Sequence, residues 1–276
     1  MKATLTITLA LLCQFCFAQT LQLKWKSDTL LRVPESVLFD AGRNVLYVSN
    51  IDGKSDGRDG EGFISQLNLD GKIKNLKWVT GLNAPKGLGM VKNNLYVADL
   101  TAVVIIDIPS GKINQTIELE GAQFLNDITT DSEGNVYVSD SSTGKIYIIK
   151  NGKAEVYFES PEFTRINGLL ALKDGLYVLD FGNGSNFIVS TDKKITKSAT
   201  TGQGADGVVM VGKNEYLVSS WHGELYFVNA KGESTKILDT KDQKINAADI
   251  AYNSKAKVVY VPTFLANCVM AYELTK

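Results

Sequence analysis

Short stretches of alternating apolar and polar residues recur along the chain at a nearly constant spacing. Six of them share a tyrosine among aliphatic residues: Leu46-Tyr47-Val48, Leu95-Tyr96-Val97, Val136-Tyr137-Val138, Leu176-Tyr177-Val178, Tyr216-Leu217-Val218 and Val259-Tyr260-Val261. Their valines lie 40 to 49 residues apart, and the longest interval contains the Gly- and Asp-rich stretch 52–62, which we interpret as a loop insertion. A unit of about 40–45 residues with four strands is typical of a β-propeller blade. The pattern therefore predicts an all-β, six-bladed β-propeller.

Each repeat follows the same internal plan. A short apolar run such as Gly168–Leu172 leads through a turn into the tyrosine strand. A third strand such as Gly144–Ile149 follows, and then a Gly-containing turn and a weaker fourth strand. No segment shows sustained helical periodicity, which argues against an α/β fold. We expect four-stranded blades in a single domain over residues 19–276.

The two ends of the chain together predict how the ring closes. The sixth repeat runs from Asp249 through Val258–Val261 to Val269–Tyr272 and lacks a fourth strand. The segment Leu21–Lys26 alternates like a strand and precedes the first repeat. Pairing this N-terminal strand beside Val269–Tyr272 would complete the last blade and cover an exposed edge.

Residues 1–18 have the pattern of a signal peptide. Lys2 precedes the apolar stretch Ala3–Cys13, and small residues at Cys16 and Ala18 suit cleavage after Ala18. The stretch is shorter than the ~20 residues that span a bilayer. We expect a secreted or periplasmic protein with no membrane association after cleavage. Cleavage leaves Cys268 as the one cysteine, so no internal disulfide can form.

The net charge of the chain argues against two classes of binding partner. The chain has 29 Lys and Arg against 30 Asp and Glu, a formal net charge of −1. It therefore lacks the basic excess that nucleic acid or an anionic membrane would require. We expect a monomer that binds a small-molecule substrate.

Alignment of the repeats places one dipeptide at the start of each innermost strand. The six are Glu35-Ser36, Lys86-Gly87, Asn126-Asp127, Asn167-Gly168, Asp206-Gly207 and Ala248-Asp249. Equivalent positions in a closed ring face one another around its axis, so the first members should meet at the mouth of the central channel. Four of these six positions carry oxygen donors, namely Glu35, Asn126, Asn167 and Asp206.

This donor set predicts a metal site. Two carboxylates and two carboxamides form a hard-oxygen set of the kind that Ca²⁺ prefers, with another hard divalent cation as the alternative. Zinc is disfavoured because one His and one Cys remain after cleavage. Asn, Asp and Gly also cap turns. Turn capping explains each residue singly, but not four oxygen donors in six equivalent positions.

The same positions carry a resemblance to a known family. Pro34-Glu35-Ser36-Val37, Leu125-Asn126-Asp127-Ile128, Ile166-Asn167-Gly168-Leu169 and Ala205-Asp206-Gly207-Val208 resemble segments of the gluconolactonase/regucalcin family and, more distantly, of paraoxonases. The resemblance covers essentially the whole chain after residue 18. It implies that Glu35, Asn167 and Asp206 bind a metal and that Asn126 contacts metal or substrate. It also implies hydrolysis of lactones or of other esters or phosphoesters.

Two positions depart from this family pattern. Gluconolactonase-like members often carry an arginine for the sugar acid two residues before the Asn126 position, where this chain has Phe124. The paraoxonase-like position of a catalytic histidine holds Lys86. Lys86 could bind an anionic substrate, act as a base, or balance the negative charge of the ring. Asp206 and Glu35 are the other candidate catalytic residues that could accept a proton.

Several other residues carry weaker signals. His222, the one histidine, follows a tyrosine strand and is a candidate substrate contact, with a turn residue as the alternative. Gly202–Gly207 matches G-x-G-x-x-G, but a strand and not a helix should follow, so a dinucleotide site is excluded. Cys268 is expected to be a buried core thiol. The aspartates that end tyrosine strands, Asp99, Asp140 and Asp180, are expected to cap turns, with substrate contacts as the alternative.

Two functions of different kinds fit these features. The first is a metal-dependent hydrolase of lactone-type esters. The second is a non-enzymatic propeller, resembling NHL-repeat scaffolds, that binds a ligand or a protein; the segment Val138–Ile146 resembles such a repeat. The convergent oxygen donors favour the hydrolase, and the absence of the family arginine favours the scaffold.

Overall fold

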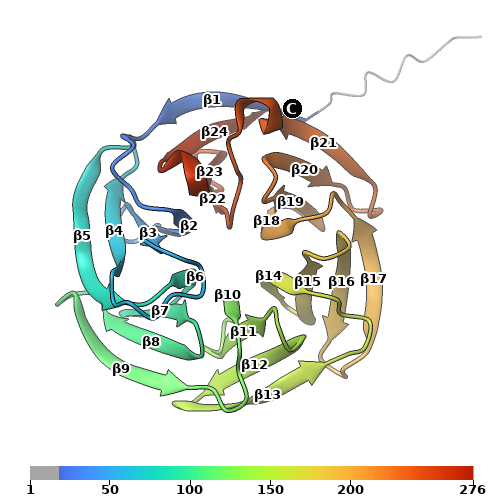
Figure 1. The fold of residues 1–276 in the computed structure, drawn as a ribbon. Helices are drawn as coiled ribbons and strands as arrows, with labels where there is room; N and C mark the ends of the chain where they lie inside the picture. The colour runs from blue at the N-terminus through green and yellow to red at the C-terminus, as the bar shows by residue number, and fades with distance from the viewer. Residues whose placement is uncertain (1–18, 276) are drawn as a thin grey trace, which may run out of the picture.

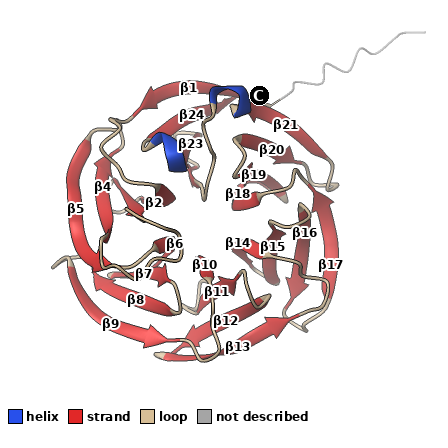
Figure 2. Cartoon of the chain, viewed as in Figure 1, coloured by secondary structure: helices blue, strands red, loops and turns tan. Residues whose placement is uncertain are grey.

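Six four-stranded antiparallel sheets are arranged as a ring around a central channel in the computed structural model, which describes residues 19–275 (Figures 1 and 2). The six-bladed all-β prediction is therefore confirmed. The expected signal peptide, residues 1–18, lies outside the described residues. Within the described range, no helix is long and apolar enough to cross a bilayer.

The blades follow one another along the chain. Blade one contains β2 (Pro34–Asp40), β3 (Val45–Asn50), β4 (Gly62–Asn68) and β5 (Ile73–Leu82). Blade two contains β6 (Pro85–Val91), β7 (Asn94–Asp99), β8 (Ala102–Asp107) and β9 (Lys112–Glu118). Blade three contains β10 (Leu125–Thr130), β11 (Val136–Asp140), β12 (Lys145–Lys150) and β13 (Lys153–Glu159).

The second half of the ring repeats this plan. Blade four contains β14 (Ile166–Leu172), β15 (Gly175–Asp180), β16 (Ser185–Ser190) and β17 (Ile195–Thr200). Blade five contains β18 (Ala205–Gly212), β19 (Glu215–Ser220), β20 (Glu224–Val228) and β21 (Ser234–Asp239). Blade six contains β22 (Ala251–Asn253), β23 (Val258–Pro262), β24 (Val269–Thr275) and β1 (Thr20–Lys26). Two 3₁₀ turns, η1 (Lys241–Gln243) and η2 (Phe264–Ala266), precede β22 and β24.

The N-terminal strand closes the ring as predicted. β1 pairs antiparallel with β24, from Thr20 opposite Thr275 to Lys26 opposite Met270, so the last blade contains both ends of the described chain (Figure 1). The Trp25 indole N–H also donates to the Leu69 carbonyl of blade one at 2.9 Å. Blade six is thereby joined to blade one through its outermost strand as well as through the core.

The core lies between neighbouring blades. The middle strands are buried on both faces, as in β3 and β15, whereas the outer strands β9 and β13 are mostly exposed. This difference explains why the tyrosine strands read as continuous apolar runs while the fourth strands looked weak in the sequence. Tyr177 and Tyr216 of adjacent blades bring their ring centroids to 4.4 Å, so the repeated tyrosine contributes to packing between blades.

The inner strands approach one another so closely that some positions cannot hold a side chain. A Cβ atom added to Gly168 of β14 would lie 2.1 Å from the carbonyl oxygen of Asp206 in β18. A Cβ atom at Gly87 of β6 would lie 2.5 Å from the carbonyl oxygen of Asn126 in β10. Both clashes are with backbone of the next blade, so neither can be relieved by a side-chain rotation. These contacts fix the spacing of the residues that precede each glycine.

This spacing can be tested with Gly168→Ala. The added methyl group must displace the Asp206 backbone, and overpacking of this kind typically costs about 1–3 kcal/mol of unfolding free energy. Chemical denaturation would measure the loss. Gly42→Ala is the control, because its nearest non-neighbouring atom is 3.4 Å away in an exposed turn. Equal stability of the two variants would contradict the close packing of β14 against β18.

Candidate functional site

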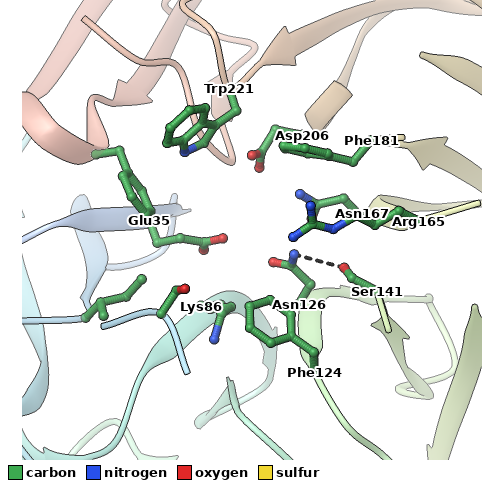
Figure 3. Close-up of a pocket in the computed structure, with 13 residues that line it drawn as sticks. Glu35, Lys86, Phe124, Asn126, Ser141, Arg165, Asn167, Phe181, Asp206 and Trp221 are labelled. Carbon is green, nitrogen blue, oxygen red and sulfur yellow. Dashed lines mark hydrogen bonds between the residues drawn. The ribbon is translucent and has the colours of Figure 1, made fainter. Parts of the chain in front are cut away.

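A β-bulge at the start of the inner strands turns one side chain of each of five blades toward the channel. The pairing register with the second strand shifts at the same point in blades one to five, for example between Pro34 and Val37 and between Leu125 and Ile128. Bulges of this kind redirect side chains. The redirected residues line one pocket, namely Glu35, Lys86, Asn126, Asn167 and Asp206 (Figure 3). Ala248, the sixth equivalent residue, is buried and apolar.

The four oxygen-bearing residues are buried at this pocket with unused bonding capacity. Glu35, Asn126, Asn167 and Asp206 are 5%, 8%, 3% and 2% exposed. Glu35 Oε2, Asn167 Oδ1 and Asp206 Oδ1 have no hydrogen-bond partner among residues 19–275. Buried polar atoms are almost always paired, so three unpartnered oxygens in one pocket mark it as a place for a polar ligand or for ordered water.

Ser141 fixes the orientation of the fourth donor. Its hydroxyl donates to the Ile166 carbonyl at 2.5 Å, so towards Asn126 it can act only as an acceptor. The Asn126 amide nitrogen donates to it at 3.0 Å (Figure 3). The amide oxygen of Asn126 is therefore the end that remains for the pocket. The donor set could hold a hard cation through four oxygens.

Burial and repulsion from neighbouring carboxylates oppose ionisation of Glu35 and Asp206. Burial raises the pKa of Glu35 well above its usual value, the charges of Asp206 and Asp249 raise it further, and Lys86 opposes this. Burial likewise raises the pKa of Asp206, with Asp249 and Asp127 adding to the effect and Arg165 lowering it. A bound cation would reverse both shifts, because it favours the charged form.

Lys86 is the buried cation of the pocket. It is 2% exposed, and its ammonium group donates to the Ala84 carbonyl at 3.0 Å and lies 4.3 Å from the centre of the Phe124 ring. Burial lowers its pKa to about 8, against the opposing charges of Glu35, Asp99 and Asp56. Lys86 is therefore a cation of the pocket lining whose ammonium group can lose its proton in the pH range around 8.

Two further carboxylates lie behind the pocket, at the second position of the aligned dipeptides. Asp127 accepts hydrogen bonds from the backbone of Ile128 and Leu169, both at 2.6 Å. Asp249 accepts a bond from the Ser36 hydroxyl at 2.5 Å. Burial raises the pKa of Asp249 to about 7. Because these bonds join blades three and four and blades six and one, Asp127 and Asp249 brace the inner ring.

The entrance of the pocket is aromatic. Phe124 and Arg165 occupy the same place in blades three and four, two residues before the bulge residue, and Phe181 and Trp221 follow the second strands of blades four and five. The Arg165 guanidinium stacks on Phe181 at 4.9 Å and points into the pocket (Figure 3). The lining encloses about 330 Å³.

The aspartates that end the tyrosine strands hold the loops that carry these entrance residues. Asp140 accepts hydrogen bonds from the backbone of Gln123 and Phe124, and Asp180 from that of Thr164 and Arg165. Asp99 accepts bonds from Asn83 and Ala84 in the same way. Their expected role as turn caps is confirmed.

The structure separates the remaining candidates from the pocket. His222 is exposed and does not line it; its ring packs at 5.7 Å against Trp221, which does line it. The expected substrate contact of His222 is therefore not supported. Gly202–Gly207 leads into strand β18, as expected, and Cys268 is buried in the core. From the 52–62 loop, Ser55 reaches the pocket.

Arg165 was missed by the sequence reasoning. Its position is equivalent to that of Phe124, so the aligned repeats could have identified it. Among the described residues, no group of three or more His, Cys, Asp or Glu is placed to hold a metal ion. The site found here has only two such residues, because half of its donors are carboxamides.

Comparisons with known proteins support the fold. No family model matches the chain, and no curated protein matches it. Among solved structures, a catalytically inactive virginiamycin B lyase from Staphylococcus aureus with quinupristin has a TM-score of 0.67 at 14% identity, covering 94% of this chain and all of that one. A candidate gluconolactonase has 0.66 at 12%, covering 95% and 94%. A protein of unknown function from Bacteroides thetaiotaomicron has 0.71 at 11%, covering 94% and 76%.

Because burial opposes ionisation of Asp206, the stability of the protein should depend on pH in a way that can be tested. The unfolded carboxyl ionises near its ordinary pKa of about 3.9, whereas the folded one holds its proton to higher pH. In metal-free protein, kept so by a chelator, the protonated Asp206 carboxyl makes its full contribution to the unfolding free energy below about pH 4. This contribution is lost as the pH rises through the raised pKa of the folded state. Asp206→Asn should therefore melt at least about 2 °C higher than the parent at pH 8, but not at pH 4.

Differential scanning calorimetry in EDTA would measure this difference. Asp28→Asn, which removes an exposed carboxylate, is the matched control and should leave the melting temperature unchanged at both pH values. If Asp206→Asn lowered the melting temperature equally at pH 4 and pH 8, the buried carboxylate would not be under electrostatic strain.

Proposed function

We propose that this protein is a Ca²⁺-dependent hydrolase of lactones or related esters, resembling the gluconolactonase/regucalcin family. The observation that carries the proposal is the set of three buried, unpartnered oxygens of Glu35, Asn167 and Asp206, joined by the amide oxygen of Asn126. Hard oxygen donors of mixed charge suit Ca²⁺. The pattern of residues 1–18 supports secretion or export to the periplasm.

The chain's own residues supply the rest of the reaction. The ion, when bound by these four residues, would polarise the carbonyl of the substrate. Hydrolysis adds water across the ester bond: the water oxygen joins the carbonyl carbon, the bond from that carbon to the ester oxygen breaks, and the alcohol oxygen gains a proton. Glu35, Asp206 and Lys86 are the pocket residues that can take up the proton of the water.

Because the solved structures with this fold also include lyases, an elimination reaction is the alternative to hydrolysis. The virginiamycin B lyase with bound quinupristin is catalytically inactive because one histidine is replaced by alanine. The one histidine of this chain, His222, is exposed outside the pocket. This difference favours hydrolysis, assisted by a metal, over a histidine-dependent elimination.

Activity assays on lactones, esters and phosphoesters, with Ca²⁺ and with EDTA, test the proposal. Lactone or ester hydrolysis should depend on Ca²⁺, and Asp206→Ala should lower kcat/KM at least about 100-fold, equivalent to about 2.7 kcal/mol of lost transition-state stabilisation. Asp28→Ala is the control. Absence of hydrolysis across the panel in Ca²⁺ would favour the non-enzymatic propeller that binds a ligand or a protein.

Lys86→Met separates the three roles open to this lysine. If the ammonium group binds an anionic substrate, KM should rise about tenfold for charged substrates and remain unchanged for neutral ones. If Lys86 is the base, kcat should fall for every substrate and one limb of the pH profile should disappear. The exposed control Lys112→Met should leave the kinetics unchanged. If Lys86→Met did so as well, Lys86 would have no part in substrate binding or catalysis.

A further inference from the structure

The walls of the pocket are more apolar than its floor. Ile51, Phe124, Phe181, Trp221 and Phe264 come from blades one, three, four, five and six and surround the oxygen donors. Trp221 and Phe264 meet edge to face, with ring centroids 5.5 Å apart at 74°. The entrance therefore offers several aromatic faces at fixed positions to an apolar part of a ligand.

The pocket has few neutral polar groups for a ligand rich in hydroxyls. The amide nitrogen of Asn126 is bound to Ser141, and the Ser141 hydroxyl is bound to the Ile166 carbonyl. The oxygens of Asn126 and Asn167 belong to the proposed metal site. The neutral donors that remain in the lining are the Ser55 hydroxyl, the Asn167 amide nitrogen and the Trp221 indole N–H. A polyhydroxylated ligand would leave hydroxyl groups unpaired against aromatic rings.

Two cations of the lining have no carboxylate partner. The Arg165 guanidinium forms no hydrogen bond or ion pair with any residue in 19–275, although it is held in place by its stacking on Phe181. The Lys86 ammonium group has one bond, to a backbone carbonyl. With Glu35 and Asp206 ionised, the four charged residues of the lining balance one another. A bound Ca²⁺ would add positive charge to this balanced lining, and the two carboxylates behind it, Asp127 and Asp249, would offset that charge only when they are ionised.

We infer that the ligand of this pocket is an anionic, largely apolar molecule, such as a lactone or ester that carries a carboxylate and an aryl or alkyl group. Its carboxylate binds the free fork of Arg165, for which a planar guanidinium is well suited, and its apolar group packs on Phe181, Trp221 and Phe264. This inference rests on the proposed function for the reactive ester group, but the recognition of charge and apolar surface can be tested without turnover.

Isothermal titration calorimetry on the purified protein with Ca²⁺ tests the inference with three probes. 4-Phenylbutyrate combines a carboxylate with an aryl group, 4-phenylbutanamide lacks the charge, and gluconate replaces the aryl group with hydroxyls. 4-Phenylbutyrate should bind at least about tenfold more tightly than either of the others. Arg165→Gln should remove its advantage over the amide, whereas Arg32→Gln, which removes an exposed arginine outside the lining, should retain it.

Three results of the titrations with Ca²⁺ would overturn the inference. Equal or tighter binding of gluconate would exclude the apolar preference, and equal binding of the amide would exclude recognition of the charge. If Arg165→Gln and Arg32→Gln lost this binding advantage equally, the preference for the carboxylate would arise from the overall electrostatic field of the protein and not from Arg165. Repeating the titration in EDTA distinguishes failure of the proposed function: an unchanged affinity for 4-phenylbutyrate would argue against a resident cation while the probe preference still stood.

Discussion

The pocket depends on the closed packing of the six inner strands around one axis. Pairing of β1 with β24 joins the ends of the ring, and the absence of a side chain at Gly87 and Gly168 lets neighbouring blades meet backbone to backbone. At this spacing, the bulge at the start of the inner strand in blades one to five directs one side chain per blade into the pocket. Residues more than 170 positions apart in the sequence, Glu35 and Asp206, therefore lie in the same pocket.

Bringing Glu35 and Asp206 into one buried pocket opposes their ionisation, and the residues of the chain do not fully offset this cost. Glu35 and Asp206 are buried together, and burial raises the pKa of both, with the charges of neighbouring carboxylates adding to the effect. Burial also raises the pKa of Asp127 and Asp249, at the second position of the aligned dipeptides, but both accept hydrogen bonds that tie the blades together. The contrast shows that the ring can satisfy a buried carboxylate where its role is structural. The oxygens left without partners face the pocket, as expected of groups reserved for a ligand.

The sequence predicted the features that repeat and missed those that do not. Blade number, ring closure and the aligned residues at Glu35, Lys86, Asn126, Asn167 and Asp206 followed from a period that every blade shares. Whether a loop side chain enters the pocket depends on local conformation instead. Arg165 enters because Asp180 holds its loop, whereas the ring of His222 packs beside Trp221 and does not line the pocket. The solved structures share 11–14% identity with this chain, so they support the fold and leave function to the site.

A crystal structure of the protein grown with Ca²⁺ tests the central claim most directly. The account predicts one ion at the mouth of the channel, with oxygens of Glu35, Asn126, Asn167 and Asp206 at about 2.3–2.6 Å and at least one further position open to water or substrate. An ion bound elsewhere, with the oxygens of Glu35, Asn167 and Asp206 still unpartnered or bridged by water alone, would contradict it.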